Sequence, residues 1–386
     1  MTTRRENMLK IFRHETPDWI PITGHADPYN QPNREGMDPE LAAALGEVQW
    51  SDESTVRFSR YMGLEIMDWY NMPLRITRRN VEIEWNSEGD VTTSVWHTPK
   101  GDLREVSRVC HDASGAVSSN WTEHLVKGPE DLPAFTSIFE DELIEPDPDA
   151  IARTRERREL IGDDGLLLGG LDGTPLGMMF RVYSGVAALA YLWADAPDAL
   201  RDCFAVMEAN YLQRLAIGVQ SDIDVVISCD DTSTTAISPA MFEACNLDLT
   251  DARADAAHAA GKLYFHHSCG LIRDLLPLYR RTKMDAVHAF TIPPIGNVAV
   301  AQGRKVLGDR ITIIPGLQQL PGPMDDRAAV RSSIHRMLRE AEPWDHFILV
   351  LAGYPNRTME QTKFVLDCCR ELGGSPENSA TGKAAQ

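Results

Sequence analysis

Short runs of apolar residues alternate along the chain with longer segments that have a helical pattern of apolar and polar positions. Val, Ile and Leu are frequent in the short runs, as in strands of a parallel sheet that is covered on both faces. Strands that alternate with helices are typical of repeated strand–helix units. Eight such runs can be counted, at residues 19–23, 64–69, 166–170, 224–228, 262–266, 286–288, 311–314 and 347–351.

Eight is the number of strands that closes a (β/α)8 barrel, a fold that can exceed the usual length of a single domain. The sequence therefore predicts an α/β protein with a TIM barrel over residues 1–374. A doubly wound open sheet is the alternative, but it would normally show fewer strands or a glycine-rich phosphate loop, and the sequence has no GxGxxG or Walker A motif. Residues 375–386 are small and polar, so we expect a disordered tail there.

Helix signals fall between the predicted strands. Proline near the start predicts a helix from residue 196 to about Gly218 and another from Ser238, which Gly261 would end as a C-cap. One stretch departs from this rhythm, because residues 73–110 alternate apolar and polar positions with the period of a strand. We predict an antiparallel β-meander inserted there after the second strand. Its expected strands are residues 75–78, 81–85, 91–96 and 103–106.

Composition narrows the class of protein. The formal net charge is −19, which argues against nucleic acid or an anionic membrane surface as a partner. No run of about 18 apolar residues occurs, so the sequence predicts no membrane span and no classical secretion signal. The seven cysteines form an odd set without disulfide-type spacing, and we therefore expect a cytoplasmic protein.

Polar side chains follow the predicted strands at their C-terminal ends, where a barrel places its active site. Their density in His, Asp and Cys is unusual, and these residue types ligate metals or move protons. The candidates are His25, Asp27, Asp68, Tyr70, Asp172, Cys229, Asp230, Asp231, His267, Cys269, His288, Gln318, Gln319, Tyr354 and Asn356.

His267-Ser268-Cys269 is the sharpest of these patterns. Residues i and i+2 of an extended segment face the same side, so the imidazole and the thiolate can converge on one ion. A His and Cys pair suits Zn²⁺, and Asp230 or Cys229 from the adjacent strand could supply a further ligand. The alternative is a buried histidine beside an inert cysteine.

The other candidates each carry two interpretations. Asp230 and Asp231 could act as base or ligand, or could belong to a capped, hydrated turn. Asp172 follows Gly169-Gly170, which indicates either close approach of a ligand or a tight turn. His288 lies inside an apolar strand, where a histidine is more often a hydrogen-bonded core residue than a catalyst.

At these residues the sequence resembles the uroporphyrinogen decarboxylase-like superfamily over most of residues 4–370. The resemblance implies a (β/α)8 barrel, in agreement with the strand count. The stretches that carry it are Arg5-Glu6-Asn7-Met8-Leu9, His14-Glu15-Thr16-Pro17-Asp18, residues 256–262 running into His266-His267-Ser268-Cys269-Gly270, and Leu307-Gly308-Asp309-Arg310.

Two branches of that superfamily differ in chemistry. The true decarboxylase is a cofactor-free enzyme of haem synthesis. It has paired arginines after the first strand that bind the propionate and acetate side chains of the porphyrinogen substrate. This sequence has residues 25–30 at that position, with only Arg34 nearby. The other branch contains zinc-dependent corrinoid methyltransferases, whose His-x-Cys after the fifth strand matches His267 and Cys269. That branch places a further cysteine after the eighth strand, where this chain has residues 352–356 without one.

The resemblance therefore implies a methyltransferase that moves a methyl group between a small methylated or methoxylated substrate and a corrinoid carried by a partner protein. Zn²⁺ would be held by His267 and Cys269, and the enzyme could form a homodimer. A metal-free decarboxylase or lyase that uses pocket carboxylates is the alternative, and a non-catalytic binding protein is a third reading. The predicted catalytic residues are Asp230 and Asp172, and the predicted substrate contacts are His25, Asp27, Tyr183, His266, His288 and Gln318.

Overall fold

A curled parallel β-sheet forms the centre of the computed structural model, which describes residues 2–24, 52–111, 117–317, 326–351 and 359–374, and positions 39 and 42. Six strands pair in parallel in the order β13-β12-β11-β10-β9-β2, and two more form the parallel pair β1-β14. Their bounds are β1 Ile22–Gly24, β2 Ile66–Asn71, β9 Gly165–Asp172, β10 Val225–Cys229, β11 Leu263–His267, β12 Ala286–Phe290, β13 Thr312–Pro315 and β14 Leu349–Leu351.

All eight strands counted in the sequence are present, each within three residues of its predicted bounds. Among the described residues, the hydrogen-bonded ladders leave the sheet in two pieces and do not close it. Isolated parallel bridges join the pieces, at Thr23–Glu65 on one side and at Ile313–Phe347 and Gly316–Val350 on the other. The fold is therefore α/β with a strongly curled parallel sheet.

Glu65 strengthens the narrow contact between β1 and β2. Its backbone N–H donates to the Ile22 carbonyl oxygen at 3.0 Å. Its buried carboxyl group accepts from the Ile22 N–H at 2.7 Å and from the Trp19 indole N–H at 2.8 Å. A side chain thus supplies hydrogen bonds where the ladder between the two strands is shortest.

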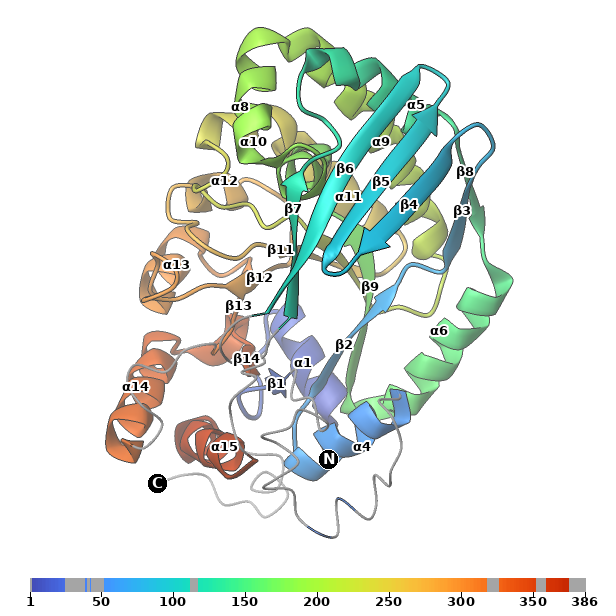
Figure 1. The fold of residues 1–386 in the computed structure, drawn as a ribbon. Helices are drawn as coiled ribbons and strands as arrows, with labels where there is room; N and C mark the ends of the chain where they lie inside the picture. The colour runs from blue at the N-terminus through green and yellow to red at the C-terminus, as the bar shows by residue number, and fades with distance from the viewer. Residues whose placement is uncertain are drawn as a thin grey trace.

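Helices cover the outside of the curled sheet (Figure 1). The expected helix from Ser238 to Gly261 is two helices that meet at Asn246, a residue type of low helix propensity. No helix among the described residues is long and apolar enough to cross a membrane. The helices are α1 Arg4–Phe12, α4 Asp52–Met62, α5 Leu132–Glu140, α6 Pro148–Ile161, α7 Pro175–Met178, α8 Gly185–Asp195, α9 Pro197–Gly218, α10 Pro239–Cys245, α11 Leu247–Ala259, α12 Leu276–Tyr279, α13 Val300–Leu307, α14 Arg327–Glu340 and α15 Met359–Gly373.

A four-stranded antiparallel sheet lies between β2 and α5 in the sequence and packs against α5 (Figure 1, cyan). Its strands pair in chain order, β4 Glu82–Glu88, β5 Val91–Thr98, β6 Gly101–His111 and β7 Val117–Glu123. Ile83, Trp96 and Leu103 stand in register across three of them. Residues 112–116, between β6 and β7, lie outside the described part.

The prediction of one four-stranded meander over residues 73–110 was wrong about which strands pair. The predicted strand 75–78 does not join the four-stranded sheet, because β3 (Leu74–Arg78) pairs antiparallel with β8 (Glu142–Pro146). Ile76 opposite Ile144 and an ion pair between Arg78 and Glu142 favour that pairing. The sheet also extends beyond residue 110, since its last strand is β7, whose polar sequence gives no alternating apolar signal.

An apolar core fills the inside of the curled sheet. Met8 and Ile11 of α1 are fully buried in it and cover the N-terminal ends of the strands. Because apolar side chains occupy this half of the interior, polar chemistry is left to the C-terminal ends of the strands. The buried strand residues of this core are Met67, Leu166, Leu168, Val225, Ile227, Phe265, Ala286, Ile314, Ile348 and Val350.

Replacing Glu65 by Gln should change how stability depends on pH. Burial raises the pKa of Glu65 above its ordinary value of 4.5, although its hydrogen bonds lower it in part. Above pH 4.5 the unfolded chain therefore releases this proton before the folded chain does. We expect the stability of the wild type, relative to Glu65→Gln, to fall as pH rises from 4.5 through the raised folded pKa.

Urea unfolding at a series of pH values measures this difference. Exposed Glu159 offers a matched control, and Glu159→Gln should show no comparable trend. The prediction would be contradicted if the free energy of unfolding of the wild type, relative to that of Glu65→Gln, stays constant or grows as pH rises.

Candidate active site

Asp231, His267 and Cys269 form a cluster at the C-terminal ends of β10 and β11. The ligand atoms of these three side chains all lie within 4.8 Å of one another. Asp231 Oδ1 is 3.1 Å from His267 Nε2, and it accepts a hydrogen bond from Cys269 Sγ at 3.0 Å. All three residues are partly accessible, so a ligand can reach them.

Backbone register explains why Asp231 reaches this cluster. β10 and β11 pair with Cys229 opposite His267. Beyond that point the N–H groups of Asp230 and Asp231 both donate to the His267 carbonyl oxygen, at 3.2 and 3.0 Å. Asp231 adopts a positive φ of 48°, which Asp tolerates better than most residues. The chain thus turns over the end of β11 and carries the Asp231 carboxylate to the imidazole.

The charges in the cluster suit a bound cation. Burial alone would raise the pKa of Asp231, but hydrogen bonds from His267 and Cys269 and the nearby Arg181 charge lower it overall. Burial and the Asp231 charge raise the pKa of the Cys269 thiol to about 12. A divalent cation reverses the second effect, because metal binding displaces the thiol proton. One carboxylate, one imidazole and one thiol are a donor set that fits Zn²⁺.

His267 is held from its other side by two aromatic rings. Its Nδ1 lies 2.9 Å from Nδ1 of His288, the residue opposite it in register on β12. Trp69 of β2 stands edge-on to His267, with ring centroids 5.3 Å apart, and lies 5.4 Å from His288. His288, a predicted substrate contact, therefore lies on the side of the His267 ring opposite to Asp231.

Arg181 is a site residue that sequence reasoning missed. It lies in a short π-helical segment, Met179–Tyr183, a form that often occurs at functional sites. Its Nε is 3.0 Å from Asp231 Oδ2, and its Nη1 donates to the Cys229 carbonyl oxygen. Sequence reasoning selected Tyr183 of the same segment but not Arg181, whose contact with Asp231 joins the segment after β9 to the end of β10.

Asp230 lies beneath the cluster and is fully buried. Its carboxylate accepts from the Thr174 N–H at 2.6 Å and from Ser228 Oγ at 2.5 Å, and lies 3.2 Å from His266 Nδ1. Burial would raise the pKa of Asp230, but the nearby His266 and Arg253 and the Ser228 hydrogen bond lower it well below its usual range. The group expected to complete the metal site is thus anchored inside the protein, and Asp231 lies with His267 and Cys269.

A buried hydrogen-bond network fixes the segment between the two predicted ligands. Thr232 Oγ1 lies 3.0 Å from His266 Nε2, 3.0 Å from Ser268 Oγ and 2.6 Å from the Tyr279 hydroxyl. All four side chains are fully buried. Ser268 lies between His267 and Cys269 in the chain, so holding it limits the movement of both. His266, predicted as a substrate contact, is fully buried and lies between Thr232 of this network and Asp230.

The remaining predicted residues are dispersed. Asp172, at the end of β9, pairs with Arg214, and its side chain stays 39% exposed. Tyr183 packs against the rings of Phe135 and Phe139, and burial raises its pKa well above the ordinary value. His25, Asp27 and Gln318 lie outside the described residues, as do residues 352–356 and the predicted tail 375–386.

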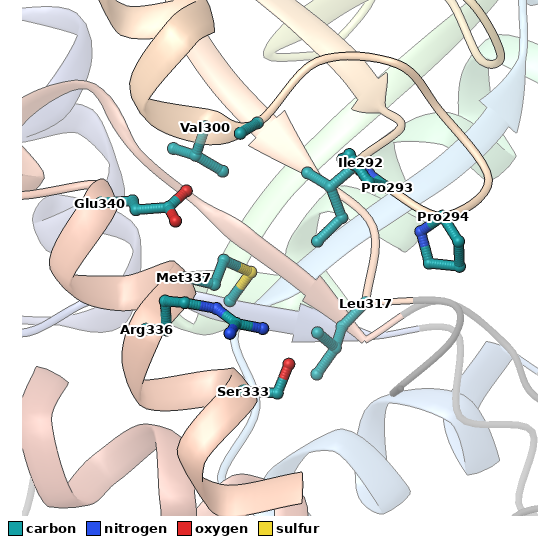
Figure 2. A pocket seen from close by; sticks show the side chains of 10 residues that line it. Ile292, Pro293, Pro294, Val300, Leu317, Ser333, Arg336, Met337 and Glu340 are labelled. Atoms are coloured by element: carbon teal, nitrogen blue, oxygen red, sulfur yellow. The ribbon is translucent and has the colours of Figure 1, made fainter. Parts of the chain in front are cut away.

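A cavity of about 320 Å³ lies between α13 and α14 (Figure 2). Its walls come from the loop after β12, from α13 and from α14, with Arg336 and Glu340 on the α14 side. A second cavity of about 250 Å³ involves His14, His258 and Arg310, near the N-terminal ends of the strands. Neither includes Asp231, His267 or Cys269.

The two neighbouring carboxylates should respond differently to truncation. Removing Asp230 breaks a buried, charge-assisted network, so Asp230→Ala should lower the free energy of unfolding by about 3–5 kcal/mol. Asp231 is partly exposed, so Asp231→Ala should change the free energy of unfolding by about 1 kcal/mol or less. Urea unfolding of chelator-treated protein tests this, and equal losses in the two variants would refute the assignment.

Three comparisons with known proteins bear on this arrangement. A family model described as "Uroporphyrinogen decarboxylase (URO-D)" matches residues 123–372. Among solved structures, a methyltransferase from Methanosarcina mazei has a TM-score of 0.59 at 14% identity, over 96% of this chain and 99% of that one. A B12-independent methionine synthase from Shewanella sp. W3-18-1 has a TM-score of 0.46 at 8% identity, over 89% and 91%. No curated protein matches. The Methanosarcina structure shares the fold of this chain.

Proposed function

We propose, from the premise that this chain belongs to the uroporphyrinogen decarboxylase family, that it is a methyltransferase acting on a small methylated or methoxylated substrate. The observation that carries the proposal is the cluster of Asp231, His267 and Cys269 at the ends of β10 and β11. The methyl group would pass to or from a corrinoid on a partner protein. In this proposal the curled sheet closes as a (β/α)8 barrel. The enzyme works in the reducing cytoplasm, a location with which seven cysteines without disulfide-type spacing are consistent.

Zinc is the metal that this donor set favours. His267 Nε2, Cys269 Sγ and an Asp231 oxygen would hold it, and Asp231 takes the place of the missing cysteine after the eighth strand. Three protein ligands with a position left for substrate are the pattern of a catalytic zinc site. When bound there, zinc supplies Lewis acidity that polarises the heteroatom carrying the methyl group.

The protein's own residues position the reacting groups. Arg181 holds the second Asp231 oxygen, which keeps the first directed at His267 and Cys269. The accessible carboxylate of Asp172, at the end of β9, is a candidate for orienting the substrate. We retain His25, Asp27 and Gln318 as proposed substrate contacts, since they follow β1 and β13 in the sequence.

The metal-free decarboxylase alternative needs a proton donor for a carbanion, and Asp230 and Asp172 were the candidates. Asp230 is fully buried, and its lowered pKa keeps it ionised rather than ready to donate a proton. Asp172 is engaged in an ion pair with Arg214. The methyl-transfer proposal is therefore the better supported of the two.

Elemental analysis of the purified protein tests the proposal. We expect about one zinc ion per chain in the wild type, and loss of that zinc in Cys269→Ala and His267→Ala. Cys229→Ala is the matched control. Cys229 ends β10 opposite His267, but it is not part of the three-residue cluster, and burial raises the pKa of its thiol to about 12.

Methyl transfer to reduced cobalamin, followed by the visible absorbance of methylcobalamin, measures turnover with a panel of methyl ethers and methylamines. Turnover should fall with zinc content in the two ligand variants and stay near wild type in Cys229→Ala. Full activity of a metal-free preparation would overturn the zinc part of the proposal. Zinc-loaded protein that transfers no methyl group from any donor in the panel would count against methyl transfer.

A further inference from the structure

Both ring nitrogens of His267 are engaged, on opposite sides. Nε2 lies 3.1 Å from Asp231 Oδ1, on the side where Cys269 also approaches. Nδ1 lies 2.9 Å from Nδ1 of His288. The ring therefore bridges the cluster and a second imidazole, and its orientation fixes which nitrogen can serve as a ligand.

The short contact between the two histidines restricts where their protons lie. A hydrogen bond between two ring nitrogens needs an N–H on one and a lone pair on the other. If His267 Nε2 gives its lone pair to a cation, the proton of that ring must lie on Nδ1. Nδ1 then donates to His288, whose Nδ1 accepts, so the proton of His288 lies on Nε2.

We infer that His288 is a positioning residue that accepts the Nδ1 proton of His267 and so presents the Nε2 lone pair of His267 to the metal. The inference rests on the zinc site of the proposed function. It assigns His288 to the support of a ligand and not to direct contact with substrate. Partners of this kind orient metal-bound histidines and raise their basicity.

Packing around the two rings supports this role. His288 is only 4% exposed, and β11 and β12 hold it opposite His267 in a parallel ladder. Trp69 stands against both rings, edge-on to His267 at an interplanar angle of 89°. A neighbour that is fixed by the sheet and by an indole is well suited to set the orientation of a ligand.

Zinc affinity, measured by competition with a chromophoric chelator, tests the inference without any turnover. His288→Leu removes the acceptor, and we expect zinc to bind about 10–100-fold more weakly. His288→Asn places an amide oxygen near the position of Nδ1 and should restore affinity close to that of the wild type. His258→Leu is the matched control, because His258 pairs with Asp285 outside the cluster and should leave affinity unchanged.

The tautomer can be read directly from the wild type. In the long-range ¹H–¹⁵N spectrum of the zinc-loaded, ¹⁵N-histidine-labelled protein, His267 should carry its proton on Nδ1 and His288 on Nε2. This readout decides the matter even if His288→Leu fails to fold.

The outcomes separate the two proposals. Wild-type protein that binds no zinc would overturn the zinc site and this inference with it. Wild-type protein that binds zinc, with His288→Leu binding it equally tightly, would overturn only the role of His288. A proton on His267 Nε2 in the zinc-loaded protein would overturn that role and would also exclude Nε2 as a zinc ligand. Weak binding by His288→Leu with recovery in His288→Asn would support the role of His288.

Discussion

The carbonyl oxygen of His267 accepts hydrogen bonds from two successive N–H groups, those of Asp230 and Asp231, and the candidate site depends on this shared acceptor. It stops the β10–β11 ladder and turns the chain across the end of β11. The two adjacent carboxylates then point in different directions. The Asp230 carboxylate accepts hydrogen bonds from Ser228 and Thr174. The Asp231 carboxylate contacts the imidazole of His267 and the thiol of Cys269. One short turn thereby provides both a buried anchor, Asp230, and a partly accessible carboxylate, Asp231, at the cluster.

The side chains of Asp230 and Asp231 lie in environments of different polarity, the first fully buried and the second partly accessible. The buried carboxylate is surrounded by donors, which is the condition under which a charge is tolerated inside a protein. Arg253, also fully buried, extends that network by donating to Ser228 Oγ and to the carbonyl oxygens of Asp172 and Gly173, and so ties β9 to β10. On the exposed side of the turn, Arg181 is paired with the Asp231 carboxylate. A buried, fully hydrogen-bonded network beside an accessible cluster suits the metal site proposed above.

Much of the fold could be predicted because its strands are buried on both faces. Runs such as residues 166–170 and 224–228 must be apolar to fill the space between core and helices, so they stand out in the sequence. The same logic failed for residues 75–78. That strand has an ordinary alternating pattern, and its partner, β8, lies more than sixty residues further along the chain. Pattern identifies a strand, but partner choice depends on which edges meet in space.

The sequence by itself determined the strand–helix order, the place of His267 and Cys269 at the end of the fifth central strand, and their convergence as alternate residues of an extended segment. It could not choose between Asp230 and Asp231, because adjacent residues look alike in a pattern and only the hydrogen bonds to the His267 carbonyl separate them. Nor could it find Arg181 or the position of His288 behind His267. Those contacts join residues from different strands and loops, and they exist only once the parallel sheet has set its register.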